Sequence, residues 1–366
     1  MAELPKNENK YYALSAIHPY IQTNIVDGTE TDVKKDFIGW GKNNDYPDYL
    51  FSLYKDCPTL QAIINGAVDY SCGDEITLNL LPYGEKINDK GETPAEVVKN
   101  CFLDYWTYGA FALNVVRNKL GGIAAVYYLP VLNIRSDKKN EFFYYSDDWG
   151  KSFGRVKYLT YPKFRPDGVE ANSILYVKRT YNGVYPIPVY AAAVKAAEIE
   201  KSIDDYHLNA IKNSFNVSAI INFNNGIPSE EVQNQINEDI QDKFTGEENV
   251  ARFLVAFNNS KDNAVTVETL DGNDWGVKYE SLAARSKQAL FTAFRMNENL
   301  AGIPTAQGFN SEEYASSFKL FNKTMIQPSQ KLMCNAFAKI FGEDCLVIEP
   351  FTISFEDDNK QVEVVE

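Results

Sequence analysis

Two long helical patterns, separated by a short β-rich segment, constrain the fold of this chain more than any other feature. Apolar residues at alternating steps of four and three predict a helix over residues 187–215, about 42 Å long at ~1.5 Å per residue: Ala192, Ala196, Ile199, Ile203, Tyr206 and Ala210. A second helix is expected over 277–300, with Leu282, Ala289, Ala293, Met296 and Leu300 on one side. Such spacing favours rods that pack beside other rods.

Residues 216–276, between these helices, predict a small β-rich module. We expect a strand over 217–223, a helix over 229–243 that begins at Ser229, and strands at Phe253–Phe257 and Ala264–Leu270.

The first half of the chain predicts a mixture of helices and strands. Residues 1–45 are polar and irregular, and an amphipathic helix is expected over 46–71, split at Pro58. Thr93 precedes Pro94 and caps an aromatic helix. Short β-rich runs then follow at Ala112–Arg117, Ile123–Leu129, Glu141–Tyr145, Arg155–Leu159 and Ile174–Arg179. The fold class is therefore α+β.

The end of the chain begins with a loop broken by glycine and proline, over 301–312. A helix from Ser311 to about Phe341 should be kinked at Pro328, and Ile348–Phe355 is expected to form one strand.

Composition limits the function. The 50 acidic residues outnumber the 36 basic ones, for a net charge of −14, which argues against a broad basic face that grips nucleic acid. The longest apolar run, 122–132, is about half of the ~20 residues that a membrane span needs, and the first residues lack a secretory signal, so we expect no membrane contact. The five scattered cysteines predict reduced thiols.

Motifs for catalysis or metal binding are incomplete. Gly150-Lys151-Ser152 lacks the first glycine of a phosphate loop, because Tyr145 stands there. The polar run 271–276 has Leu282 where a calcium loop needs glutamate. Adjacent carboxylates such as Asp204 and Asp205 diverge on a helix, and Cys101 with His207 forms no recognisable nucleophile pair. We expect no catalytic residue, no metal and no cofactor.

Several stretches, taken in order, resemble the siphovirus-type family of phage portal proteins. They are Asp56–Ile64 with Asp69–Gly73, Tyr105–Arg117, Leu129–Arg135, Arg295–Pro304 and Phe318–Pro328. The chain departs from the family in two places. Little chain remains after Phe341, which implies a small or missing crown domain. Val184–Pro188 only partly matches the family's segment before the first stem helix.

The resemblance implies a ring of twelve subunits around a channel at one capsid vertex, assembled in the virion from protein made in the host cytoplasm. Double-stranded DNA would pass through it, driven by the terminase large subunit. Further partners would be the head–tail adaptor and the major capsid protein. Carried over in order, the parts are a wing (1–186), a first stem helix (187–215), a clip (216–276), a second stem helix (277–300), a tunnel loop (301–312) and a tunnel-loop helix with a crown remnant (313–366).

The same resemblance implies three groups of functional residues. The tunnel loop has no charged residue between Ala301 and Asn310 and would face DNA through Gly302, Thr305, Gln307, Gly308 and Asn310. Five basic stem residues would line the channel or form pairs between subunits with Glu198, Asp204 and Glu298. They are Lys195, Lys201, Arg285, Lys287 and Arg295. An acidic docking surface on the clip would contain Glu230, Glu231, Glu238, Asp239 and Asp242.

Two alternatives stay open from the sequence. One is another ring-forming virion component, such as a baseplate or tail-completion subunit. The other is a hydrolase with two converging carboxylates, for which the sequence shows no specific pair.

Overall fold

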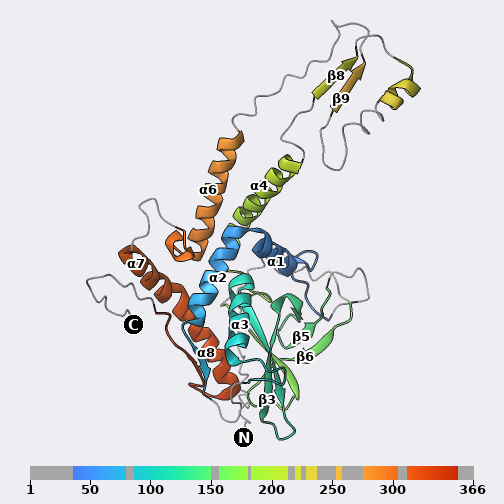
Figure 1. Ribbon diagram of the computed structural model, residues 1–366. Coiled ribbons are helices and arrows are strands. Elements are labelled where there is room, and N and C mark those ends of the chain that lie inside the picture. Colours follow the sequence, from blue (N-terminus) through green and yellow to red (C-terminus); the bar gives the residue numbers. More distant parts are fainter. Residues whose placement is uncertain are drawn as a thin grey trace, which may run out of the picture. The chain divides into compact units, whose positions relative to one another are not determined.

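The computed structural model describes residues 36–79, 86–149, 156–179, 183–212, 219–223, 228–236, 253–257, 275–303 and 311–352. They form an α+β fold, as predicted (Figure 1). The chain divides into two compact units: unit 1 comprises 1–50, 71–188 and 329–352, and unit 2 comprises 51–70, 189–328 and 353–366. Three predicted features lie outside the described residues: the N-terminal arm up to residue 35, the Gly150-Lys151-Ser152 motif and the strand at 264–270.

Helix α3 (Pro94–Tyr108) is the central helix of unit 1, and its predicted start is confirmed. The Glu96 backbone N–H donates to Thr93 Oγ1 at 3.2 Å, and the Thr93 N–H donates to the Glu96 carboxylate at 2.8 Å. The helix ends at Gly109, which has a left-handed φ of 84°. A Cβ there would lie 2.8 Å from the Ile187 carbonyl oxygen, so both conformation and space require glycine.

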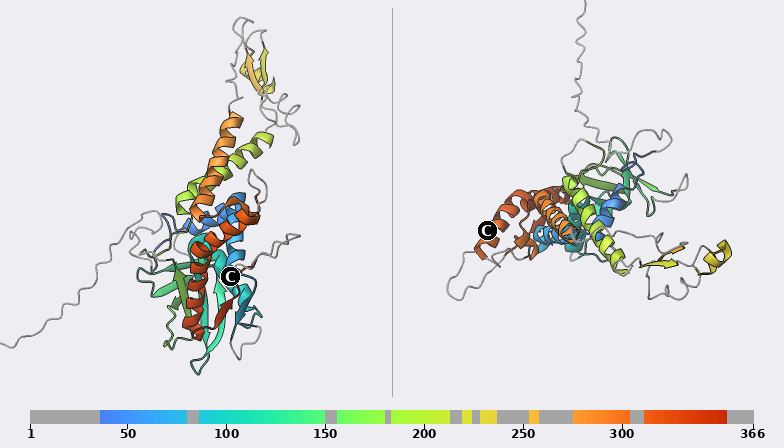
Figure 2. Two further views of the ribbon diagram at one scale, coloured as in Figure 1. Left: turned by 90° about the vertical axis from the view of Figure 1, so that its left-hand side faces the viewer. Right: turned by 90° about the horizontal axis from the view of Figure 1, so that it is seen from above.

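Two antiparallel sheets accompany α3 in unit 1 (Figures 1 and 2). In the first, β2 (Ala110–Arg117) lies between β3 (Ile123–Leu129) and β7 (Asn172–Lys178), and the first half of β2 is fully buried. The second contains β4 (Ile134–Ser136), β5 (Phe142–Tyr145) and β6 (Leu159–Pro162). A further antiparallel pair joins β1 (Ile76–Leu78) to β10 (Leu346–Ile348).

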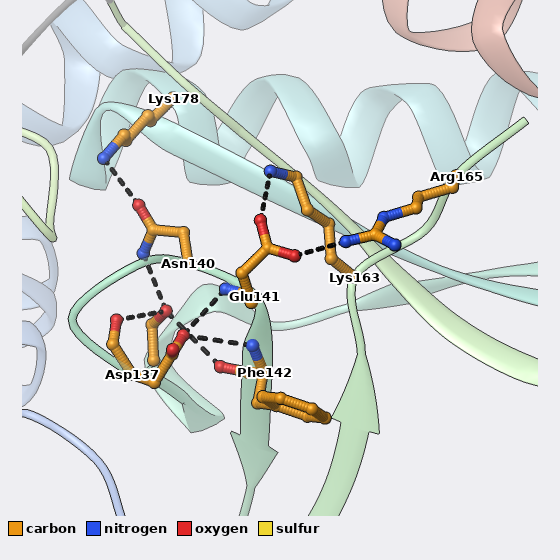
Figure 3. A network of polar contacts seen from close by, with 8 residues as sticks. Asp137, Asn140, Glu141, Phe142, Lys163, Arg165 and Lys178 are labelled. Atoms are coloured by element: carbon orange, nitrogen blue, oxygen red, sulfur yellow. Dashed lines mark hydrogen bonds and ion pairs between the residues drawn. The ribbon is translucent and has the colours of Figure 1, made fainter. Parts of the chain in front are cut away.

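The turn between β4 and β5 is fixed by a polar network (Figure 3). Asp137 Oδ1 accepts the backbone N–H groups of Glu141 and Phe142 at 2.7 and 3.0 Å. The Glu141 carboxylate contacts Lys163 at 3.2 Å and Arg165 at 2.6 Å, and these ion pairs lower its pKa. The network ties the turn to the end of β6.

In unit 2, the predicted break at Pro58 is confirmed: α1 (Tyr46–Asp56) ends before it and α2 (Pro58–Cys72) begins at it, and both helices continue into unit 1. The two long helices are α4 (Val194–Lys212) and α6 (Trp275–Phe294), which lie side by side (Figure 1). Between them in sequence, β8 (Ala219–Phe223) and β9 (Phe253–Phe257) form a parallel pair.

Both long helices are shorter than the sequence predicts. The first begins at Val194 rather than 187, after a 3₁₀ turn at Ala191–Ala193, because Pro186 and Pro188 hold the preceding backbone out of the helical region. The second ends at Phe294 rather than 300. Arg295 has a left-handed φ of 55°, and the Met296 N–H then donates to the Phe291 carbonyl, which closes the helix.

Other boundaries also differ from expectation. The strand predicted at 155–159 lies at Leu159–Pro162, and the tail strand predicted over 348–355 lies at Leu346–Ile348. The stretch Leu129–Arg135 is interrupted by a 3₁₀ turn at Val131–Asn133, because Pro130 ends the strand.

The C-terminal helix is irregular one turn before the predicted kink. It consists of α7 (Ser311–Phe321), a π-helical turn at Asn322–Ile326 and α8 (Gln327–Phe341). Pro328 cannot donate to the carbonyl four residues earlier, and the wider π turn accommodates its ring. No helix in the described part of the chain is long and apolar enough to cross a membrane.

Candidate channel loop and docking surfaces

The expected tunnel loop follows a 3₁₀ turn of unit 2, Glu298–Ala301. Gly302 closes this turn with a φ of 76°, and its N–H donates to the Asn299 carbonyl at 3.1 Å. Gly302 is exposed, and a Cβ there would meet nothing within 4 Å, so its backbone conformation rather than space selects glycine. The other predicted loop residues lie outside the described residues: Thr305, Gln307, Gly308 and Asn310.

Tyr70 on α2 joins the two ends of this loop. Its hydroxyl donates to the Leu300 carbonyl at 2.7 Å. The Tyr314 hydroxyl, on the other side of the loop, lies 2.7 Å from the Tyr70 hydroxyl oxygen. The Tyr70 ring contacts Phe318 and Phe321 at centroid distances of 5.3 and 6.2 Å. Burial raises the pKa of Tyr70, so the phenol remains a neutral donor.

A second contact also crosses the base of the loop. Asn297 Nδ2, before the loop, donates to Ser317 Oγ, after it, at 3.0 Å. Glu298, between these residues in the 3₁₀ turn, pairs with Lys287 of α6 at 3.0 Å. The loop therefore starts and ends on a base that is fixed by side chains from α2, α6 and α7.

Two of the five basic residues predicted to act in the stem have a partner within the same subunit. Lys287 pairs with Glu298, and Lys201 pairs with Asp56 of α1, a contact that raises the pKa of Lys201. Lys195 is exposed on α4, and Arg285 and Arg295 are exposed on and just after α6.

Next to Lys201, Glu200 caps α2. Its carboxylate accepts the Thr59 backbone N–H at 3.1 Å, where the positive end of the helix dipole favours an anion. The adjacent Cys57 thiol is buried, which raises its pKa to about 12. Sequence reasoning missed this contact, because Thr59 and Glu200 are far apart in the chain and neither belongs to a motif.

An open groove of about 600 Å³ runs between α4 and α6. Its walls are Lys195, Glu198, Ile199, Ser202, Ile203 and Tyr206 from α4, and Tyr279 and Leu282 from α6. The groove is mostly apolar, and the aromatic rings of Tyr206 and Tyr279 meet at a centroid distance of 5.0 Å.

The predicted acidic docking surface lies only partly within the described residues. Residues 230–236 are helical, Glu230 and Glu231 are exposed in the first turn, and the Gln233 N–H donates to the Ser229 carbonyl at 3.0 Å. Glu238, Asp239 and Asp242 lie outside the described residues.

Charge is divided unequally between the units. Unit 1 has 24 acidic and 22 basic residues, and unit 2 has 26 acidic and 14 basic residues. Their net charges are thus −2 and −12, and unit 2 holds most of the −14 of the chain.

The residues that suggested catalysis do not form a site within the described residues. Cys101 is buried in α3 of unit 1, whereas His207 belongs to unit 2 and packs on Tyr279 at 5.7 Å. Asp204 and Asp205 are exposed on α4. No group of three or more acidic, histidine or cysteine side chains among the described residues could hold a metal ion.

Solved structures share this fold. A chain from the virion of a native gene transfer agent particle matches with a TM-score of 0.54 and 15% identity, over 84% of this chain and 83% of that chain. A chain from the neck of the native gene transfer agent particle, computed with C12 symmetry, matches with a TM-score of 0.54 and 14% identity, over 82% and 83%. An HK97 family phage portal protein from Corynebacterium diphtheriae matches with a TM-score of 0.48 and 13% identity, over 82% and 94%.

Sequence comparison gives a family. None of the curated proteins matches the chain. The model of the family described as phage portal protein matches residues 86–361, which is most of the chain. The chain therefore belongs to the phage portal protein family, the virion components that occupy a capsid vertex.

Proposed function

We propose that twelve copies of the chain form a ring at one capsid vertex, with an axial channel for double-stranded DNA. The terminase large subunit packages DNA through this channel, and the DNA leaves through it at infection. The family supports this function, and the similar chain from a neck computed with C12 symmetry supports the number twelve. The chain itself serves as a structural conduit without catalysis, since the terminase drives the transport.

The observation that carries the proposal is the fixed base of the uncharged loop over 301–310. Contacts of Tyr70 and of Asn297 hold the two ends of the loop together. The loop sequence contains no lysine or arginine that would bind phosphate. A loop of this kind contacts moving DNA through polar groups. Because it neutralises no phosphates, it releases no counterions and does not bind the DNA tightly. We assign Gly302, Thr305, Gln307, Gly308 and Asn310 to the channel.

The negative charge of unit 2 supports the same conduit. In a ring of twelve, a net −12 per copy surrounds the channel with negative potential, which repels DNA from the wall. Of the five basic residues predicted for the stem, Lys201 and Lys287 pair with carboxylates of their own subunit. We assign the other three, Lys195, Arg285 and Arg295, to contacts outside the subunit.

The parts carried over from the family are assigned accordingly. Residues 1–186 form the wing, 187–215 and 277–300 the stem, 216–276 the clip, 301–312 the tunnel loop, and 313–366 the tunnel-loop helix with a crown remnant. The clip offers Glu230, Glu231, Glu238, Asp239 and Asp242 to basic faces of the terminase and the head–tail adaptor. The major capsid protein surrounds the ring at the vertex.

A photo-crosslinking experiment tests the channel assignment. A photoreactive amino acid replaces Gln307, and particles are irradiated when filled with DNA and when empty. We expect DNA crosslinks to the portal in filled particles alone. Filled particles whose portal gives no crosslink from position 307 would contradict the assignment of the loop to the channel.

A further inference from the structure

The groove between α4 and α6 leaves large apolar side chains uncovered. The exposed fractions of Ile199, Tyr206 and Leu282 are 39%, 49% and 39%, although all three face the same groove. Their positions on α4 and α6 follow helical spacing, so the uncovered surface is a stripe along the two helices. A stripe of this form fits the side of another helix.

Another side of α6 has the opposite character. Its residues are exposed, small or polar, and spaced by three and four: Ser281, Ala284, Arg285, Gln288 and Thr292. We call them the small face of α6. The Thr292 hydroxyl donates to the Gln288 backbone carbonyl at 2.7 Å, so it is satisfied within the helix. Ser281, Ala284 and Thr292 have short side chains, which let a helix approach a neighbour closely.

The groove wall carries one charge of each sign, and the small face carries one positive charge. Glu198 is exposed in the groove wall, and Arg285 is the charged residue of the small face. Lys195, one turn before Glu198, also lines the groove. Arg285 is attracted by Glu198 and repelled by Lys195, and this contrast selects one register between a groove and an inserted helix.

We infer that the small face of α6 of one copy packs in the α4–α6 groove of the next copy, with Arg285 against Glu198. The inference rests on the proposed ring and names the surfaces that close it. The contact is head-to-tail, because the groove and the small face are different surfaces of one chain. Contacts of this kind repeat around an axis until the ring closes. Each copy covers one groove and has its own groove covered.

A charge exchange tests the pair. Glu198→Arg alone and Arg285→Glu alone each place like charges at the contact, and each should raise the protein concentration for half-assembly about tenfold, the effect of ~1.4 kcal/mol. The double variant restores attraction and should return assembly toward wild type. The readout is native mass spectrometry over a dilution series. Lys319→Glu, on the exposed side of α7, is the control for charge reversal and should assemble as wild type.

A second variant tests the groove without changing charge. Ser202→Trp fills the groove from an exposed position on α4, so the subunit should fold, as judged by its circular dichroism, but should not form rings. Normal rings from Ser202→Trp, or no recovery in the double charge variant, would overturn the inference. Loss of adaptor binding with normal rings would overturn it too, because the groove would then serve another partner. A wild-type chain that forms no ring would instead refute the proposed function.

Discussion

The hydroxyl oxygens of Tyr70 and Tyr314 lie 2.7 Å apart, although 244 positions separate these residues in the chain. Tyr70 donates its own proton to the Leu300 carbonyl, so Tyr314 is the donor to Tyr70. Three segments, one before the loop, one after it and one from α2, thus meet at a single phenol. This phenol fixes both ends of the loop that we assign to the channel.

Removing the Tyr70 hydroxyl should loosen the base of the loop. Tyr70→Phe retains the ring packing on Phe318 but leaves the Leu300 carbonyl and the Tyr314 hydroxyl without this partner. We expect a loss of about 1 kcal/mol in the free energy of unfolding and lower DNA packaging by rings that still assemble. Chemical denaturation of the subunit and a packaging assay measure the two effects.

The control for this variant is Tyr54→Phe. The Tyr54 hydroxyl of α1 donates to Asn65 Oδ1 of α2 at 2.8 Å, in a solvent-exposed hydrogen bond that involves neither end of the loop. It should change packaging little. Equal packaging by Tyr70→Phe and wild-type rings would show that the Tyr70 contacts do not serve the channel.

A negative charge in the loop should hinder the passage of DNA. Gln307→Glu adds one carboxylate per copy, and twelve carboxylates around the channel repel phosphate. We expect reduced packaging or retention of DNA with intact rings, measured as packaged DNA per particle. Asn172→Asp adds the same charge at an exposed position in unit 1 and should package normally. Unchanged packaging by Gln307→Glu would count against the loop.

Charge reversal on the clip should weaken docking. Glu238→Lys with Asp239→Lys replaces two negative charges by two positive ones on the proposed docking surface, and we expect at least about tenfold weaker binding of the terminase or the adaptor. Binding to the assembled ring is measured by surface plasmon resonance. Asp167→Lys with Glu170→Lys makes the same change on a loop of unit 1 and serves as the matched variant. If both double variants bind alike, the acidic clip is not the docking surface.

Asp104 should make the stability of the subunit depend on pH. Its carboxyl is buried in α3 and accepts the Val131 N–H at 2.7 Å, and burial raises its pKa to about 7. A raised carboxyl pKa means that the folded state binds the proton more tightly than the unfolded state, whose pKa is about 4. The contribution of Asp104 to stability therefore falls as the pH rises from about 4 to about 7, and is lowest above 7.

The variant Asp104→Asn tests this dependence. Asparagine accepts the same Val131 N–H through its carbonyl oxygen and has no charge to bury. The fall in stability from pH 5 to pH 7.5, measured by urea denaturation, should be smaller than in wild type by up to about 1.4 kcal/mol per pH unit. Asp167→Asn, on an exposed loop, should follow the wild-type curve. Parallel curves for Asp104→Asn and wild type would contradict a raised pKa.

Local signals in the sequence predicted some helix boundaries, whereas the start of α4 was placed seven residues too early. Pro58 and Thr93 act through their own backbone and side chain, so both starts were found. The end of α6 was placed six residues too late, because the left-handed position is occupied by Arg295 and not by glycine. The β1–β10 pairing, in which Ile76 lies opposite Ile348, could not be predicted, because neither segment alone carries a pattern that indicates its partner strand.

The lack of charge in the expected tunnel loop can be read from the sequence, whereas the residues that hold its two ends cannot. The absence of charge over 301–310 is readable from the sequence, and the family implies its place. The residues that hold the two ends of the loop cannot be predicted from the sequence alone. Tyr70 appears in the sequence as an aromatic residue near the end of an amphipathic helix, and its hydrogen bonds depend on tertiary packing with Leu300 and Tyr314. The Lys201–Asp56 pair likewise depends on how α4 packs beside α1.

Electron cryomicroscopy of the purified protein tests the central claim most directly. The account predicts closed rings of twelve copies, about 497 kDa from twelve chains of 41.4 kDa, with an axial channel and the segment after Gly302 next to it. Isolated compact particles, or rings in which Gly302 lies far from the axis, would contradict it.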